Sequence, residues 1–280
     1  MKNAMKSIAV AVATLLTVTG LTVSTGPVAA AAPGSAPSIV DANRAAHRAA
    51  EAALDRTSFN PSRAIRGGAG IWIERKDGSV NPCTVTNVVR KNGVNYAITA
   101  GHCIWGAVTE IRHKGRVIAD AKDVRAGWHT VQGNKQPGGH YINDFGYFRL
   151  KPHVKVQYNV VRLDRINPVH VAASDGNRAL HRKTVNAPFG QPLRVHQGMV
   201  GQIACKEGNT TGLTCGPIVR VNEKTQDVSG LIPSRPGDSG SPLYLLGRDG
   251  KRHLIGQLAG GTHYAYKSYD GYAHNLARIK

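Results

Sequence analysis

The chain has 280 residues, of which 41% are hydrophobic, so it is long enough to bury a sizeable core. Its formal net charge of +19 favours contact with an anionic surface such as cell-wall polymers, lipid headgroups or acidic proteins. No Lys/Arg-rich run is long enough for a nucleic-acid-binding arm, and no CxxC or Cys/His spacing indicates a metal site. We therefore expect a solvated basic surface, no specific nucleic-acid partner and no metal.

The first 32 residues have the three parts of a secretory signal peptide. Lys2 and Lys6 give a basic start, residues 8–16 form a short apolar core, and residues 30–32 are three alanines suited to cleavage. The apolar core is too short to span a membrane, and no second candidate span follows. We expect a secreted, extracellular protein, in which the four cysteines would form two disulfides with three possible pairings.

Residues 33–66 form a segment of different composition. The stretch 39–56 is rich in alanine, which favours helix, and Asp41 is suited to cap the start of that helix. Pro61 prevents the helix from continuing. The segment is either a short pro-segment or an N-terminal extension, because composition does not show processing.

From Gly67 onward the sequence has an all-β texture. Short runs rich in Val, Ile, Thr and Tyr alternate with turn signals, and a helical period occurs only near residues 273–279. The runs 70–74, 86–90 and 243–246 are followed by Asp77-Gly78, Asn92-Gly93 and Asp249-Gly250, which suit two-residue hairpin turns.

Three segments that carry chemistry follow one another within this β region. They are Thr99-Ala100-Gly101-His102-Cys103, Asn143-Asp144-Phe145-Gly146-Tyr147 and Pro236-Gly237-Asp238-Ser239-Gly240-Ser241-Pro242. The weakly acidic hydroxyl of Ser239 needs a base, here His102, and that base needs a carboxylate, here Asp144, to fix its tautomer. The N–H groups of Gly237 and Ser239 would form an oxyanion hole. Taken alone, Gly-Asp-Ser-Gly also suits an ordinary turn.

These three segments, together with Cys205 to Gly216, resemble the chymotrypsin-like serine peptidase family, in particular its bacterial secreted branch of streptogrisin and alpha-lytic protease-like enzymes. The resemblance implies an all-β peptidase domain over residues 67–280, built from two antiparallel six-stranded β-barrels with the active site in the cleft between them. His102 and Asp144 would lie on the first barrel and Ser239 on the second.

The resemblance also implies several supporting contacts. Two disulfides are expected, Cys83–Cys103 and Cys205–Cys215. Lys206 would form a structural ion pair with Asp238, replacing the liberated N-terminal amine of animal trypsin-like enzymes, whose start sequence is absent here.

The specificity pocket is expected to have an apolar floor. Pro233 stands six residues before Ser239, where trypsin-like members carry the Asp that binds basic side chains. With Ala259, Gly260 and Gly261 as open walls, this pocket favours small or apolar residues before the cleaved bond, the P1 position, because a buried ammonium would stay unpaired. The alternative is that Asp270 lines the same pocket and attracts Lys or Arg.

The sequence therefore predicts a secreted serine endopeptidase that hydrolyses peptide or protein substrates through an acyl-enzyme, without a cofactor. One alternative is a non-catalytic binding protein that uses a protease-like scaffold and its basic surface. Another is a basic cell-wall or nucleic-acid binder whose motif matches are accidental. Reaction with a fluorophosphonate distinguishes the first prediction from both alternatives.

Overall fold

The computed structural model describes residues 38, 40–42, 44–46, 48–49, 63–133, 142–161, 187–262 and 265–279. The predicted signal peptide, residues 1–32, lies outside the described residues. Most of the predicted extension is also outside them, but its described residues 40–42, 44–46 and 48–49 are helical, as the alanine-rich composition predicts. Arg48 Nε of this helix lies 3.2 Å from Glu74 Oε1. None of the described helices is long and apolar enough to cross a bilayer.

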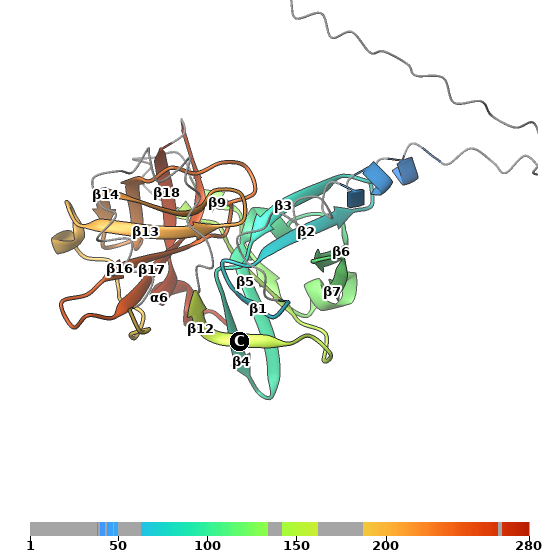
Figure 1. Cartoon of the computed structure of the whole chain (residues 1–280), viewed down its shortest axis with the longest axis horizontal. Coiled ribbons are helices and arrows are strands. Elements are labelled where there is room, and N and C mark those ends of the chain that lie inside the picture. The colour runs from blue at the N-terminus through green and yellow to red at the C-terminus, as the bar shows by residue number, and fades with distance from the viewer. Residues whose placement is uncertain are drawn as a thin grey trace, which may run out of the picture. The chain divides into compact units, whose positions relative to one another are not determined.

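The second half of the domain is a closed six-stranded antiparallel barrel (Figure 1). Its strands are β13 (Ile203–Gly208), β14 (Gly212–Asn222), β15 (Asp227–Leu231), β16 (Pro242–Leu246), β17 (Arg252–Gly261) and β18 (Tyr266–Gly271). They are hydrogen-bonded in the order β13-β14-β15-β18-β17-β16. Apolar side chains from all six strands meet inside, including Ile218, Ile255 and Tyr269, so the barrel has its own core.

The first half consists of open sheets around a separate core that includes Ile71, Ile111 and Phe148. One four-stranded sheet has the order β3-β2-β6-β7 and the other has the order β4-β5-β11-β8. Two smaller pairs are β1 with β12, which is parallel, and β9 with β10. The bounds are β1 (Ile65–Gly67), β2 (Gly70–Arg75), β3 (Val80–Thr84), β4 (Asn87–Lys91), β5 (Val94–Ala100), β6 (Val108–His113), β7 (Arg116–Asp120), β8 (Trp128–His129), β9 (Gln132–Gly133), β10 (Ile142–Asn143), β11 (Phe145–Arg149) and β12 (Val156–Val161).

The structure thus has one closed barrel where the sequence predicted two. The strand run breaks after β3, because Thr84 N–H donates to Ser239 O (2.8 Å) and Thr86 N–H donates to Ile98 O (2.7 Å). The chain passes from one sheet to the other at this point instead of continuing one ladder. A second break follows β7, where the Asp120 side chain caps helix α3 (Ala121–Arg125).

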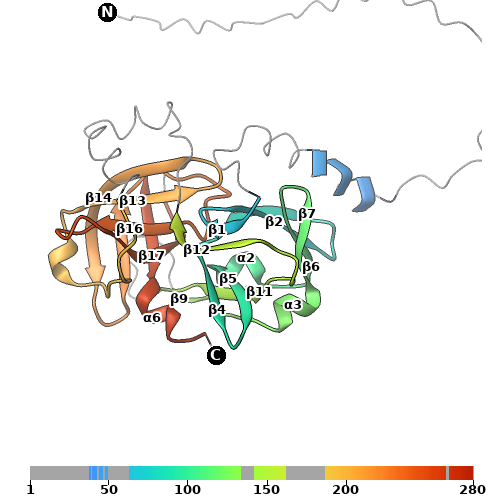
Figure 2. The same ribbon diagram turned by 60° about the horizontal axis from the view of Figure 1, so that its bottom comes forward.

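A third core joins the two halves. It combines side chains from the first half, such as Ile98 and Phe145, with Leu254 and Tyr272 from the second. Tyr272 begins the C-terminal helix α6 (Tyr272–Leu276), which lies against β17 (Figure 2). The described residues also form the short helix α2 (Gly101–Ile104) and a 3-10 turn at Gln197–Met199. Burial of this shared core holds the two halves against each other.

Candidate active site

His102 and Asp144 form a directly hydrogen-bonded pair. The antiparallel register of β5 and β11 places Ala100 opposite Phe145, so the residues beside them meet. His102 Nδ1 lies 2.7 Å from Asp144 Oδ2, and the His102 backbone N–H donates to Asp144 Oδ1 (2.8 Å). The Asp144 side chain is fully buried, whereas the His102 side chain is 31% exposed. The carboxylate therefore orients the imidazole and leaves Nε2 available for chemistry.

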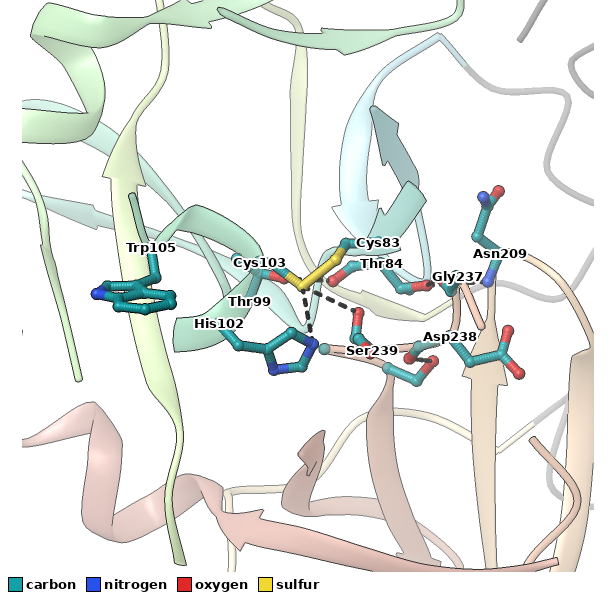
Figure 3. Close-up of a disulfide and its surroundings, with 12 residues drawn as sticks. Cys83, Thr84, Thr99, His102, Cys103, Trp105, Asn209, Gly237, Asp238 and Ser239 are labelled. Carbon is teal, nitrogen blue, oxygen red and sulfur yellow. Dashed lines mark hydrogen bonds between the residues drawn. A yellow bond between two sulfur atoms is a disulfide. The ribbon is translucent and has the colours of Figure 1, made fainter. Parts of the chain in front are cut away.

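Ser239 lies on the Nε2 side of His102, in the loop between β15 and β16 (Figure 3). The disulfide sulfur Cys103 Sγ is 3.8 Å from His102 Nε2 and 3.9 Å from the Ser239 carbonyl oxygen. Cys103 is bonded to Cys83, and Cys205 is bonded to Cys215, so both expected disulfides are present in the structure. The structure thus brings His102 and Asp144 into direct contact, and Cys103 Sγ lies between His102 Nε2 and the Ser239 backbone carbonyl.

Two N–H groups of the Ser239 loop remain available for an oxyanion. The N–H of Asp238 donates to Arg235 O and that of Gly240 to Leu258 O. Among the residues that the structure describes, the N–H groups of Gly237 and Ser239 have no protein acceptor. Gly237 has a φ of +98°, a conformation that other residues rarely adopt. This arrangement suits the predicted oxyanion hole, in which two converging donors stabilise a developing negative charge.

Threonine hydroxyls hold the carbonyl groups of the same loop. Thr84 Oγ1 donates to Gly237 O (2.8 Å), and Thr210 Oγ1 donates to Pro236 O (2.8 Å). Because C=O and N–H point in opposite directions across a trans peptide, the bond at Pro236 directs the Gly237 N–H the other way. Sequence reasoning missed these threonines. The position of Thr84 directly after Cys83, whose partner adjoins His102, was the available signal.

Asp238 and Lys206 form a fully buried ion pair, with 3.1 Å between Asp238 Oδ2 and Lys206 Nζ. The carboxylate also accepts hydrogen bonds from the backbone N–H groups of Thr210, Thr211 and Arg235, and from the Thr211 hydroxyl. Burial alone would raise the pKa of Asp238, but Lys206 and these donors outweigh burial and hold it below its ordinary value. This pair anchors the residue immediately before Ser239.

Ser241, two residues after Ser239, is a hydrogen-bonding residue of the same loop. It is fully buried, and its hydroxyl donates to the Asp238 carbonyl oxygen. Its backbone N–H also donates to that oxygen (2.8 Å). The serine therefore adds a donor to the loop.

The predicted pocket residues lie at one end of the closed barrel. Pro233 follows β15, and its carbonyl accepts a hydrogen bond from Thr214 Oγ1 (2.7 Å). Ala259 is buried near the end of β17, and Gly260 and Gly261 are half-buried beside it. The Asp270 side chain contacts the segment of Asp144 instead, where its Oδ2 accepts the backbone N–H of Asp144 (2.8 Å). Asp270 thus supports the segment that carries Asp144.

We predict that Asp270 makes the protein less stable as the pH rises. Burial raises the pKa of Asp270 to about 7, whereas an unfolded Asp releases its proton near 4. The folded state therefore binds the extra proton between these values, so the contribution of Asp270 to stability is greatest below pH 4 and falls until about pH 7. Asp270→Asn cannot ionise and keeps an acceptor for the Asp144 N–H. We expect this variant to be more stable than the parent at pH 8, by on the order of 2 to 4 kcal/mol.

Denaturant unfolding of both proteins at pH 4 and pH 8 measures this effect. The advantage of Asp270→Asn should nearly vanish at pH 4, where Asp270 is protonated in the folded parent and about half protonated in the unfolded parent. Titration of Asp238 is common to the two proteins and cancels in the comparison. If the two proteins differ in stability by the same amount at both pH values, folding does not raise the pKa of Asp270.

Comparison with known proteins gives distant relatives. No protein-family model matches the sequence. An uncharacterized protein of Mycobacterium tuberculosis is 29% identical over 216 residues, which cover 74% of this chain and 81% of that protein. Serine protease 2 of Streptomyces fradiae is 29% identical over 167 residues, covering 56% of this chain and 76% of that enzyme. Thermobifida fusca protease A, a solved structure, is 21% identical and has a TM-score of 0.47. The match covers 77% of this chain and 95% of that structure.

Proposed function

Because this chain is a distant homologue of the chymotrypsin-like serine proteases, in their bacterial secreted branch, we propose that it is a secreted serine endopeptidase. The observation that carries the proposal is the His102–Asp144 pair, with Ser239 on the Nε2 side of the imidazole. The site needs no cofactor for this chemistry, and its substrate is a peptide or protein.

In the proposed mechanism, the Ser239 hydroxyl attacks the carbonyl carbon of the substrate peptide bond while His102 Nε2 accepts its proton. Asp144 stabilises the imidazolium that forms, and the N–H groups of Gly237 and Ser239 bind the oxyanion. His102 then donates the proton to the leaving amine, and the acyl-enzyme remains on Ser239. Water, deprotonated by His102, attacks the acyl carbon and releases the second product.

A fluorophosphonate probe tests this proposal directly, since it phosphonylates an activated serine. The secreted chain should be labelled, and Ser239→Ala should not be. Absence of labelling in the folded parent chain would favour the alternative of a binding protein on a protease-like scaffold. Intact labelling of Ser239→Ala would assign the nucleophile to another residue.

The proposed enzyme discriminates against Lys and Arg at P1. Pro233 offers no carboxylate at the pocket floor, and small or apolar side chains suit an apolar floor better than an ammonium does. The carboxylate of Asp270 is engaged by the Asp144 N–H. We expect kcat/KM for Arg and Lys p-nitroanilides to be at least about tenfold below that for the Ala analogue. Efficient hydrolysis of the Arg substrate that disappears in Asp270→Asn would contradict this prediction.

A further inference from the structure

Lys267 lies on β18, at the end of the barrel where the specificity pocket is predicted. Strand β18 is hydrogen-bonded between β15 and β17. Lys267 pairs with the predicted wall residue Gly261. On the other side, Ile232 N–H donates to Ala265 O (2.7 Å), which holds the chain just before Pro233 against the start of β18. Strand pairing thus brings Lys267 to the predicted wall and floor of the pocket.

The same end of the barrel adjoins the nucleophile loop. Leu258 O accepts the N–H of Gly240 (2.8 Å), and Leu258 N–H donates to Ser241 O (2.9 Å). Gly261 is three residues farther along β17, a distance of about 10 Å in a strand. Lys267, opposite Gly261, is therefore within reach of a substrate side chain next to Ser239.

The Lys267 side chain projects from the inner face of β18. Alternate residues of a strand face the same side, and Tyr269, two residues on, is fully buried in the barrel core. Asp270 projects from the other face, toward Asp144. The stem of Lys267 lies against Gly261, since a Cβ on that glycine would be 2.8 Å from Lys267 Cδ. Glycine at 261 therefore leaves room for the lysine stem in the wall.

Lys267 adds a partly desolvated positive charge to this region. Burial lowers its pKa, and the nearby Lys206 ammonium lowers it further, against the opposing effect of Asp238. Asp238 is already paired with Lys206 at 3.1 Å. A substrate carboxylate beside Lys267 would form a charge-assisted hydrogen bond with its ammonium.

We propose that Lys267 binds the side-chain carboxylate of an acidic P1 residue, Glu or Asp. This inference rests on the proposed peptidase function and places acidic residues ahead of the small and apolar ones that the floor alone would select. It keeps the discrimination against Lys and Arg, which the Lys267 ammonium would repel.

Peptide p-nitroanilides that differ only in Glu or Gln at P1 isolate the effect of the carboxylate. For the parent chain, kcat/KM should be about 10- to 100-fold higher for Glu than for Gln, the range of one hydrogen bond to a charged group. Lys267→Met keeps the stem without the charge, and its Glu/Gln ratio should fall to about one or below. Fluorophosphonate labelling of the variant checks that its nucleophile still reacts. Lys251→Met, at an exposed lysine of the same barrel, removes an equal charge and should keep the parent ratio.

The outcomes separate this inference from the function on which it rests. A parent chain that reacts with the fluorophosphonate but cleaves Gln as well as Glu, or a Lys267→Met variant with an unchanged ratio, overturns the inference alone. A folded parent chain inert toward the probe and all peptides overturns both. If Lys267→Met unfolds, Lys267→Gln is measured instead and should lose the preference in the same way.

Discussion

Ser239→Ala is expected to lower the turnover of peptide hydrolysis by about 10⁴- to 10⁶-fold while leaving the fold unchanged. The proposed nucleophile is the only group in this mechanism that forms a covalent bond to the substrate, so its loss removes the acyl-enzyme route entirely. What remains is binding and oxyanion stabilisation. Turnover of a cleaved p-nitroanilide and the thermal midpoint, measured on the same preparation, check the two parts of the prediction.

Two further variants show whether the three side chains act as one unit. His102→Ala should be about as damaging as Ser239→Ala, and the double variant little worse than either single one, because neither residue supports the covalent route alone. Ser79→Ala, in a turn of the first half where Ser79 Oγ donates to Asp77, is the matched serine control. Full residual activity in Ser239→Ala, or multiplicative losses in the double variant, would be incompatible with the assignment.

Lys206→Met is expected to destabilise the protein by about 3 to 5 kcal/mol and to reduce its activity. The variant leaves the Asp238 carboxylate without its cation while it stays 0% exposed. The same loop carries the N–H groups that are proposed to bind the oxyanion. The remaining hydrogen bonds from Thr210, Thr211 and Arg235 orient the carboxylate but do not neutralise it. Denaturant midpoints and the rate of fluorophosphonate labelling measure the two effects separately.

The matched control is a set of chains whose mature N-terminus is shifted by a few residues. These chains should keep parent activity, since the geometry assigns the Asp238 partner to Lys206 and not to a liberated amine. Combining Lys206→Met with Asp238→Asn should recover part of the lost stability by removing the unpaired charge. If the shifted chains lose activity while Lys206→Met keeps it, the protein uses an N-terminal latch and the prediction fails.

Local sequence determined the features that depend on short-range chemistry. The alternation of β-branched runs with Asp-Gly and Asn-Gly pairs indicated the all-β class, and β2, β4 and β16 occur where those runs predicted strands. The family motifs also led to the His102–Asp144 pair and to Ser239 as the proposed nucleophile, because these residues sit in short segments with recognisable neighbours. The family resemblance also predicted the Lys206–Asp238 ion pair, because Lys206 directly follows Cys205.

Only the tertiary structure decided features that depend on distant partners. The first half is not a closed barrel, since Thr84 and Thr86 bind Ser239 and Ile98 in place of a continued ladder. Asp270 supports Asp144 and does not line the pocket, because the face that a strand residue presents follows from its pairing register. Lys267 stands 28 residues after Ser239, and only the closure of six strands brings it to the predicted pocket. Such contacts leave no local pattern in the sequence, because their spacing is set by how strands pair across the barrel.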